Sequence, residues 1–259
     1  MPRHMFANAR ANARVGDELG AAFERCGLRA RYQGRYRNVI ALPPVEGPVT
    51  FVAAHYDSVA GSPGADDNAS GLAVMLECAR LLAQGGFPVG FIAFNGEEDG
   101  LLGSRDFVNR GSSELPCPIR LVHVLEMVGF RATTSDPPAR LPLPWVPSGL
   151  KIPDFLGLIA KGPSNAVVDR VIASPDAPGL RLVGAKTWGP LHKLIPDLTR
   201  SDHFPFWNAG IPAVLWTDTG NFRNPNYHRA TDTPDTLDYR FMQGVTDVLV
   251  AVLATRSPA

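Results

Sequence analysis

This sequence lacks the features that mark several large classes of protein. Its 25 basic and 25 acidic residues give a formal net charge of zero, so no excess of positive charge indicates binding to nucleic acid or an anionic membrane. No run reaches the roughly 18 apolar residues needed to span a bilayer. The polar start MPRHMFANARANAR has no apolar signal core, so we expect a cytoplasmic protein without a membrane partner.

Cysteine is also scarce, whereas proline is abundant. The chain has three cysteines without zinc-knuckle spacing, which favours reduced thiols; one disulfide with one free thiol is the alternative. Many of the 24 prolines fall in 131–158, which is too long and proline-rich for a simple connection. We expect this segment to be a lid or pocket wall within a single catalytic domain, 1–259, because no internal repeat divides the chain.

Apolar runs of strand length alternate with helical patterns along the chain. The runs at 49–54, 89–94 and 119–125 are nearly continuous, as in strands that are covered on both faces. Further strands are expected at 38–42 and 210–216. Helical spacing occurs at 10–26, 68–84, 102–109, 164–174 and 239–256. This order predicts a three-layer α/β/α fold with a mixed, mainly parallel central sheet, and Asn68 or Ser70 as the cap of the second helix.

Polar side chains gather where these strands give way to loops. Because ligands bind at the carboxyl ends of strands in such sheets, we expect these side chains to lie close together. Histidine nitrogen with several carboxylates is the ligand set of a hydrolytic zinc site. The sequence therefore predicts metal-activated water that attacks a carbonyl group. The residues concerned are His55, Asp57, Asp66, Asp67, Glu97, Glu98 and Glu126.

Five motifs, in this order, resemble those of the co-catalytic di-zinc aminopeptidase family. That family includes bacterial leucine aminopeptidases, glutamate carboxypeptidases and glutaminyl cyclases, and the resemblance runs from about residue 38 to the end of the chain. It implies a zinc-peptidase fold and two Zn²⁺ per chain. The motifs are HYDS (55–58), GADDNASG (64–71), NGEEDGLLGS (95–104), SDHFPFWNAGIP (201–212) and YHRATDTPDTLD (227–238).

The resemblance implies that both zinc ions share the carboxylate of Asp67. His55, Asp67 and Glu126 would hold the first ion, and Asp67, Glu98 and His228 the second. Three carboxylates and a hydroxide then balance four positive charges, as a buried site favours. Glu126 departs from the family, in which many members have the shorter aspartate at this position. The alternative is a mononuclear site with Glu126 outside the ligand set.

Three further residues have catalytic roles by the same resemblance. Glu97 resembles the general base, and Asp57 resembles the acid that orients His55. Tyr227 resembles a tyrosine that stabilises the oxyanion in some aminopeptidases, at a position where cyclases more often carry tryptophan. An ordinary loop tyrosine is the alternative.

Several other polar and aromatic residues in or near these motifs are expected to have structural roles. We expect Asp202 to hold a loop near the cleft rather than to bind metal, and Asp66 to shape the loop beside Asp67. His123 lies within an apolar run and is expected to be a core histidine. Phe206 and Trp207 are expected to pack in the core.

These features together predict a zinc-dependent aminopeptidase that hydrolyses the N-terminal residue of a peptide or amino-acyl amide, with Glu97 as general base. The alternatives are a glutaminyl-peptide cyclase with a single zinc, another zinc amidohydrolase, and a binding module without activity. We expect the substrate pocket around 130–158 and 191–200. The sequence does not indicate an oligomeric state.

Overall fold

The computed structural model describes residues 1–44, 46–132, 154–173 and 179–255. One mixed sheet of eight strands runs through the molecule in the order β1-β2-β4-β3-β5-β8-β6-β7. The strands are β1 (Arg29–Gln33), β2 (Asn38–Leu42), β3 (Val49–His55), β4 (Val89–Phe94), β5 (Ile119–Leu125), β6 (Phe155–Lys161), β7 (Arg181–Thr187) and β8 (Ala213–Thr217).

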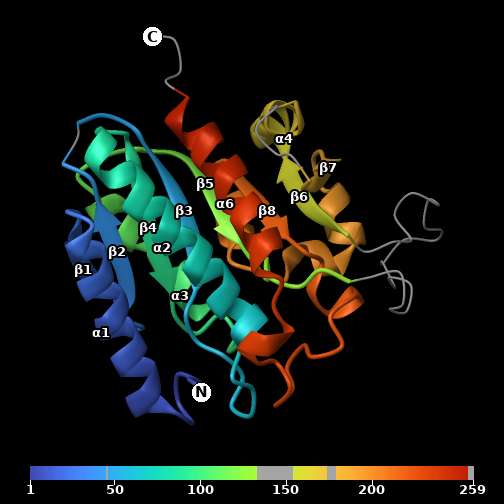
Figure 1. The fold of residues 1–259 in the computed structure, drawn as a ribbon. Coiled ribbons are helices and arrows are strands. Elements are labelled where there is room, and N and C mark those ends of the chain that lie inside the picture. The colour runs from blue at the N-terminus through green and yellow to red at the C-terminus, as the bar shows by residue number, and fades with distance from the viewer. Residues whose placement is uncertain (45, 133–153, 174–178, 256–259) are drawn as a thin grey trace.

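Helices cover both faces of this sheet, which confirms the three-layer α/β/α prediction. The described helices are α1 (Ala9–Arg25), α2 (Gly71–Leu82), α3 (Leu102–Asn109), α4 (Asn165–Ile172), α5 (His203–Asn208) and α6 (Tyr239–Ala254). Figure 1 shows α1, α2 and α6 side by side across one face, which α4 also covers. Helices α3 and α5 pack against the opposite face through Phe107 and Phe206, both fully buried beside Phe94.

The centre of the sheet is parallel and buried on both faces. Strands β4, β3, β5 and β8 pair in parallel, whereas β1 with β2, β2 with β4, and β6 with β8 pair antiparallel. Every residue of β4 is buried, which explains its continuous apolar run. His55 pairs with Phe94, and Leu125 pairs with Trp216, so the central strands end at one edge. The polar loops that follow these strands therefore meet there.

The predicted helix 68–84 starts later than expected. Residues 65–70 form an irregular turn with non-helical backbone angles at Asp67 and Asn68, and the regular helix α2 begins at Gly71. The predicted caps were wrong, because these side chains bind another loop. Asn68 Nδ2 donates to the carbonyl of Leu125 (2.8 Å), and Ser70 Oγ accepts from the N–H of Val128 (3.0 Å). These bonds join the turn to the segment after β5.

Four elements were missed from the sequence: β1, β6, β7 and α5. Strands β1 and β7 are edge strands with mainly exposed or half-buried side chains, so they lack an apolar run. Strand β6 begins inside the segment 131–158 that we predicted as a lid, since residues 155–158 pair within the sheet. Residues 133–153 lie outside the described part of the chain. The lid and the single domain over 1–259 stay predictions.

Candidate metal centre

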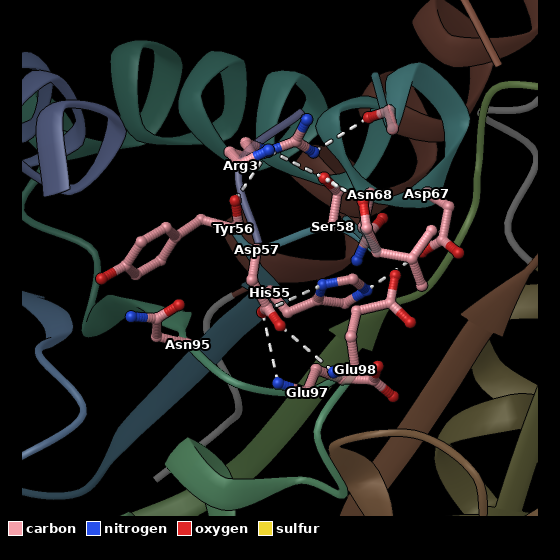
Figure 2. Close-up of polar contacts among 12 residues, drawn as sticks. Arg3, His55, Tyr56, Asp57, Ser58, Asp67, Asn68, Asn95, Glu97 and Glu98 are labelled. Atoms are coloured by element: carbon pink, nitrogen blue, oxygen red, sulfur yellow. Dashed lines mark hydrogen bonds and ion pairs between the residues drawn. The ribbon is translucent and has the colours of Figure 1, made fainter. Parts of the chain in front are cut away.

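Asp57 connects two of the loops that meet at the sheet edge. His55 is the last residue of β3, and both it and Asp57 are fully buried. Asp57 Oδ1 lies 3.5 Å from His55 Nδ1. The same carboxylate accepts hydrogen bonds from the backbone N–H groups of Glu97 and Glu98, each at 3.2 Å (Figure 2). One side chain thus lies next to the histidine ring and anchors the loop after β4.

Asp67 occupies the position between two histidines. Its Oδ1 lies 3.2 Å from His55 Nε2, and its Oδ2 lies 3.1 Å from His228 Nε2. The Asp232 carboxylate accepts hydrogen bonds from the backbone N–H of Asp66 (2.8 Å) and of Asp67 (3.1 Å), which holds the irregular turn in place. Each oxygen of the Asp67 carboxylate therefore faces a different histidine, as a bridging ligand requires.

The structure brings all five predicted metal ligands into two groups that share Asp67. The first group is His55, Asp67 and Glu126, and the second is Asp67, Glu98 and His228; within each, the ligand atoms lie within 4.8 Å of one another. His55 Nε2 lies 3.5 Å from Glu126 Oε2, and His228 Nε2 lies 3.1 Å from Glu98 Oε2. The added methylene of Glu126 does not take its carboxylate away from His55.

The donor atoms suit a divalent cation. His55 is fully buried, and its Nε2 faces the carboxylates of Asp67 and Glu126 rather than a backbone hydrogen-bond partner. Glu98 Oε1 is buried and makes no hydrogen bond to the described residues. Buried groups of this kind are ordinarily satisfied by a hydrogen bond or by a metal. Two imidazole nitrogens and three carboxylates form a mixed nitrogen and oxygen donor set of the type that binds Zn²⁺ at hydrolytic sites.

The excess of carboxylates favours positive charge at this site. Burial lowers the pKa of His228, but hydrogen bonding to Asp67 and Glu98 outweighs it and raises the pKa to about 9. The pKa of His55 also lies well above its ordinary value despite burial, because Glu126 and Glu97 are near. Burial, and then the neighbouring Asp67, raises the pKa of Glu98 to about 7. A cation bound among these groups would relieve the same repulsion between acids.

A cavity of about 460 Å³ opens beside the two groups. Glu97, Glu98 and Glu126 lie in its acidic wall, and Tyr227 and His228 also line it. Apolar side chains also line it, namely Leu101, Met127, Ile159, Leu198, Leu215 and Phe222. Residues 197–200 of the predicted pocket segment line the cavity, and residues 133–153 are outside the described chain. The cavity can hold a small organic group against the candidate ligands.

Glu97 and Tyr227, the predicted catalytic residues, both line the cavity. Burial and then Glu126 raise the pKa of Glu97 well above its ordinary value, although His55 opposes this. The Tyr227 hydroxyl accepts a hydrogen bond from Arg200 Nη2 (3.0 Å), and its ring stacks on His228 at 3.7 Å between centroids. Since arginine only donates, the hydroxyl proton of Tyr227 stays available to another acceptor.

Backbone strain is concentrated around the cavity. Five non-glycine residues of the described chain have positive φ, and four of them, Leu101, Met127, Thr219 and His228, line this cavity. Such conformations cost about 1–3 kcal/mol each and persist where the surrounding structure enforces them. This clustering is typical of a functional site.

Most of the remaining predicted residues lie as expected. Asp66 accepts hydrogen bonds from Asn224 (2.6 Å) and the backbone of Gly129 (2.9 Å), which shapes the loop. His123 is 1% exposed and accepts a hydrogen bond from Trp216 (3.0 Å), and burial lowers its pKa to about 3. Asp202 is buried, and burial raises its pKa to about 7, but its expected part in holding a loop stays a prediction. Phe206 and Trp207 pack in the core.

Sequence reasoning missed three residues that support the site. Ser201 donates a hydrogen bond to Glu126 Oε2 (2.7 Å), and Asp232 holds the backbone of Asp67. Both lie within motifs that we had singled out, at positions to which we had given no role. Arg3 lies far outside those motifs, and no pattern in the sequence indicates it.

Comparison with known proteins identifies the family. The sequence matches peptidase family M28 over residues 38–141 and 190–253, more than half of the chain. It is 33% identical over 236 residues to the uncharacterized protein YfbL of Escherichia coli, covering 85% of this chain and 71% of YfbL. It is 30% identical over 210 residues to aminopeptidase YwaD of Bacillus subtilis, covering 79% of this chain and 40% of YwaD.

Solved structures have the same fold. A zinc aminopeptidase from Bacillus subtilis is 28% identical with a TM-score of 0.58, over 84% of this chain and 49% of that one. A glutaminyl cyclase from Porphyromonas gingivalis is 20% identical with a TM-score of 0.69, over 97% of this chain and 92% of that one. The chain thus spans about half or less of the two aminopeptidases compared.

In the described part of the chain, no helix is long and apolar enough to cross a membrane. The predicted cytoplasmic location stays a prediction. The shared motifs, the fold and the sequence match agree that this chain belongs to peptidase family M28.

Proposed function

We propose that this protein is a zinc-dependent aminopeptidase that removes the N-terminal residue of a peptide. One observation carries the proposal: two groups of three metal-ligand side chains share Asp67 in the wall of a cavity. Relatives in the family that are named aminopeptidases support the same activity. The narrower steps below concern the residues of this chain.

In this proposal two zinc ions bind in the two groups. His55, Asp67 and Glu126 would hold one ion, and Asp67, Glu98 and His228 would hold the other. Bound zinc would supply a more acidic water and would polarise the carbonyl of the scissile amide. Asp57 keeps the His55 ring in the orientation that points Nε2 at the site, since it lies 3.5 Å from Nδ1.

Glu97 acts as the general base in the proposed reaction. Its carboxylate lines the cavity, and its backbone is held by Asp57. It takes a proton from the attacking water and passes this proton to the leaving amine, which completes cleavage of the amide bond. A positioned base of this kind contributes about 10²–10⁴-fold to the rate.

Tyr227 stabilises the developing oxyanion in this proposal. Arg200 occupies an acceptor site on its hydroxyl oxygen, so the hydroxyl proton can point to the substrate. A donor of this kind acts on charge that develops in the transition state rather than on the ground state.

The cavity suits an N-terminal residue with an apolar side chain. The Glu97 carboxylate can attract the free ammonium group, and the apolar side chains that line the cavity can contact the side chain of the residue released. A peptide or an amino-acyl amide has both features.

A glutaminyl cyclase is the second candidate, because a cyclase shares the fold over nearly the whole of both chains. Identity at this level supports the fold alone. Two ligand groups and a tyrosine at position 227 favour the peptidase over a single-zinc cyclase. Hydrolysis of another amide, such as an N-acyl amino acid, uses the same site chemistry.

Metal content and turnover test the proposal together. We expect about two zinc ions per chain, and release of p-nitroaniline from leucine-p-nitroanilide that a chelator abolishes and added zinc restores. One zinc with conversion of a glutaminyl peptide to its pyroglutamyl product would instead establish the cyclase. Zinc-loaded protein with neither activity would exclude both.

A further inference from the structure

The N-terminal segment contains a buried arginine next to the candidate metal site. Arg3 is 5% exposed. Among the described residues, no other arginine or lysine is buried. It precedes residue 38, where the match to the family begins. Asp57, Asp67, Asp232 and Glu98 lie near its guanidinium and favour its charge, whereas burial opposes it.

The guanidinium of Arg3 binds the backbone of the segment that joins His55 to Asp67. Its Nε donates to the carbonyl of Tyr56 (2.6 Å), its Nη1 to that of Pro63 (2.5 Å) and its Nη2 to that of Gly64 (2.9 Å). The backbone N–H of Arg3 donates to Ser58 Oγ (3.0 Å). Figure 2 shows Arg3 beside the chain that carries His55, Asp57 and Ser58. Both ends of this connection are therefore tied to one side chain.

Two features of the sequence make this contact possible. Gly64 has φ +66°, and a side chain there would meet Ser58 Cβ at 2.8 Å and Arg3 Nη1 at 3.0 Å. Asn12, in α1, donates to the backbone carbonyl of Arg3 and to Asn95 Oδ1, both at 2.9 Å. Asn95 comes two residues before Glu97. The N-terminal segment is thus joined to the connection after β3, which carries Asp67, and to the loop after β4, which carries Glu98.

We propose that Arg3 is a positioning residue that holds the segment from Tyr56 to Gly64, and through it His55 and Asp67, in the geometry that binds metal. This inference rests on the ligand set of the proposed function. Arg3 does not reach the reacting atoms; it acts through the backbone on the two ligands that its segment connects. Five donors in a planar arrangement allow arginine to bind three carbonyls at once, which a single ammonium group does not reproduce.

The sign of the effect on zinc binding separates this role from a purely electrostatic one. Removal of a nearby positive charge would by itself strengthen binding of a cation. Loss of the backbone anchor would weaken it, because the ligands would have to be ordered when the metal binds. Groups that orient metal ligands typically change metal affinity by 10–100-fold.

The test is the zinc dissociation constant, measured by competition with a chromophoric chelator, for Arg3→Met and Arg3→Lys. Amide hydrogen exchange of residues 56–68 is followed in the metal-free proteins. Arg14→Met is the matched control, since Arg14 lies in α1 and its side chain is 71% exposed. We expect zinc binding about 10–100-fold weaker in Arg3→Met, a smaller loss in Arg3→Lys, faster exchange in both, and an unchanged control.

Several results would overturn the inference. Zinc affinity within twofold of the unchanged protein, or tighter binding, would show that the anchor does not serve the metal site, even if the melting temperature fell. If Arg3→Met does not fold, the zinc affinity of Arg3→Lys tests the inference instead. If neither variant folds, Arg3 stabilises the whole fold rather than the metal site, and the inference is wrong. Wild-type protein that binds no zinc would instead refute the proposed function, while the exchange measurement would still report on the anchor.

Discussion

Replacement of Asp57 by asparagine should weaken zinc binding without unfolding the protein. The Asp57 carboxylate accepts hydrogen bonds from the N–H groups of Glu97 and Glu98 and lies 3.5 Å from His55 Nδ1. Asparagine has nearly the same shape but replaces one oxygen with an NH₂ group. The NH₂ group cannot accept a hydrogen bond, so at least one of the donors around Asp57, a backbone N–H or the His55 imidazole, would lose its acceptor.

The expected magnitude follows from the lost interaction. A hydrogen bond to a charged group contributes about 1.5–3 kcal/mol, and each 1.4 kcal/mol corresponds to about tenfold in an equilibrium constant. If this loss falls on the ordered ligand geometry, zinc binding should weaken by about 10–100-fold, in agreement with the usual effect of groups that orient metal ligands.

Chelator competition at pH 7.5 would measure the zinc affinity of Asp57→Asn. Asp17→Asn is the matched control, because Asp17 has a side chain that is 62% exposed and pairs with Arg37 in a different part of the molecule. Turnover at saturating zinc would show whether the rate falls as well, since Asp57 also holds the backbone of Glu97. Zinc affinity and turnover both within twofold of wild type would refute the reasoning.

Three further substitutions test other parts of the site and the core. Glu97→Gln should retain zinc but lose about 10²-fold or more in kcat, and normal turnover would exclude it as the base. Asp67→Ala should lose most bound metal by elemental analysis, because both ligand groups use it. Burial lowers the pKa of His123 to about 3 from an ordinary 6.5, so the unfolded chain binds more protons below pH 6.5 and stability is lost as pH falls towards 3. His123→Gln, which can still accept from Trp216, should reduce the difference in urea midpoint between pH 7 and pH 5; an equal difference would argue against this origin.

The central strands could be predicted from the sequence because strands that are buried on both faces consist of continuous apolar runs. The predicted strand 119–125 agrees with β5 at both ends, and the predicted helix 102–109 agrees with α3. Edge strands such as β1, with the sequence RARYQ, are mostly exposed to solvent, so they have no apolar run and were missed. The start of α2 was also misplaced, because Asn68 and Ser70 bind the loop after β5 instead of capping a helix.

The candidate ligands were predictable as residue types but not as a constellation. His55, Asp67, Glu98 and Glu126 follow strands or precede a helix in recognisable motifs, so their presence at one sheet edge follows from the parallel order of the strands. Resemblance to a family supplied their division into two groups. Whether the longer Glu126 reaches His55 depends on side-chain geometry, and the distance of 3.5 Å is a property of the folded chain.

The layered α/β class, the buried strands and the acidic edge could all be predicted, since each of these depends on local composition and period. What surrounds that edge depends instead on the packing of elements that are distant in the chain. Arg3 is separated from its partner Gly64 by α1 and the strands β1, β2 and β3, and Asp232 comes from near the other end of the chain. Contacts between residues so far apart depend on how the elements pack, and no local pattern along the chain records them.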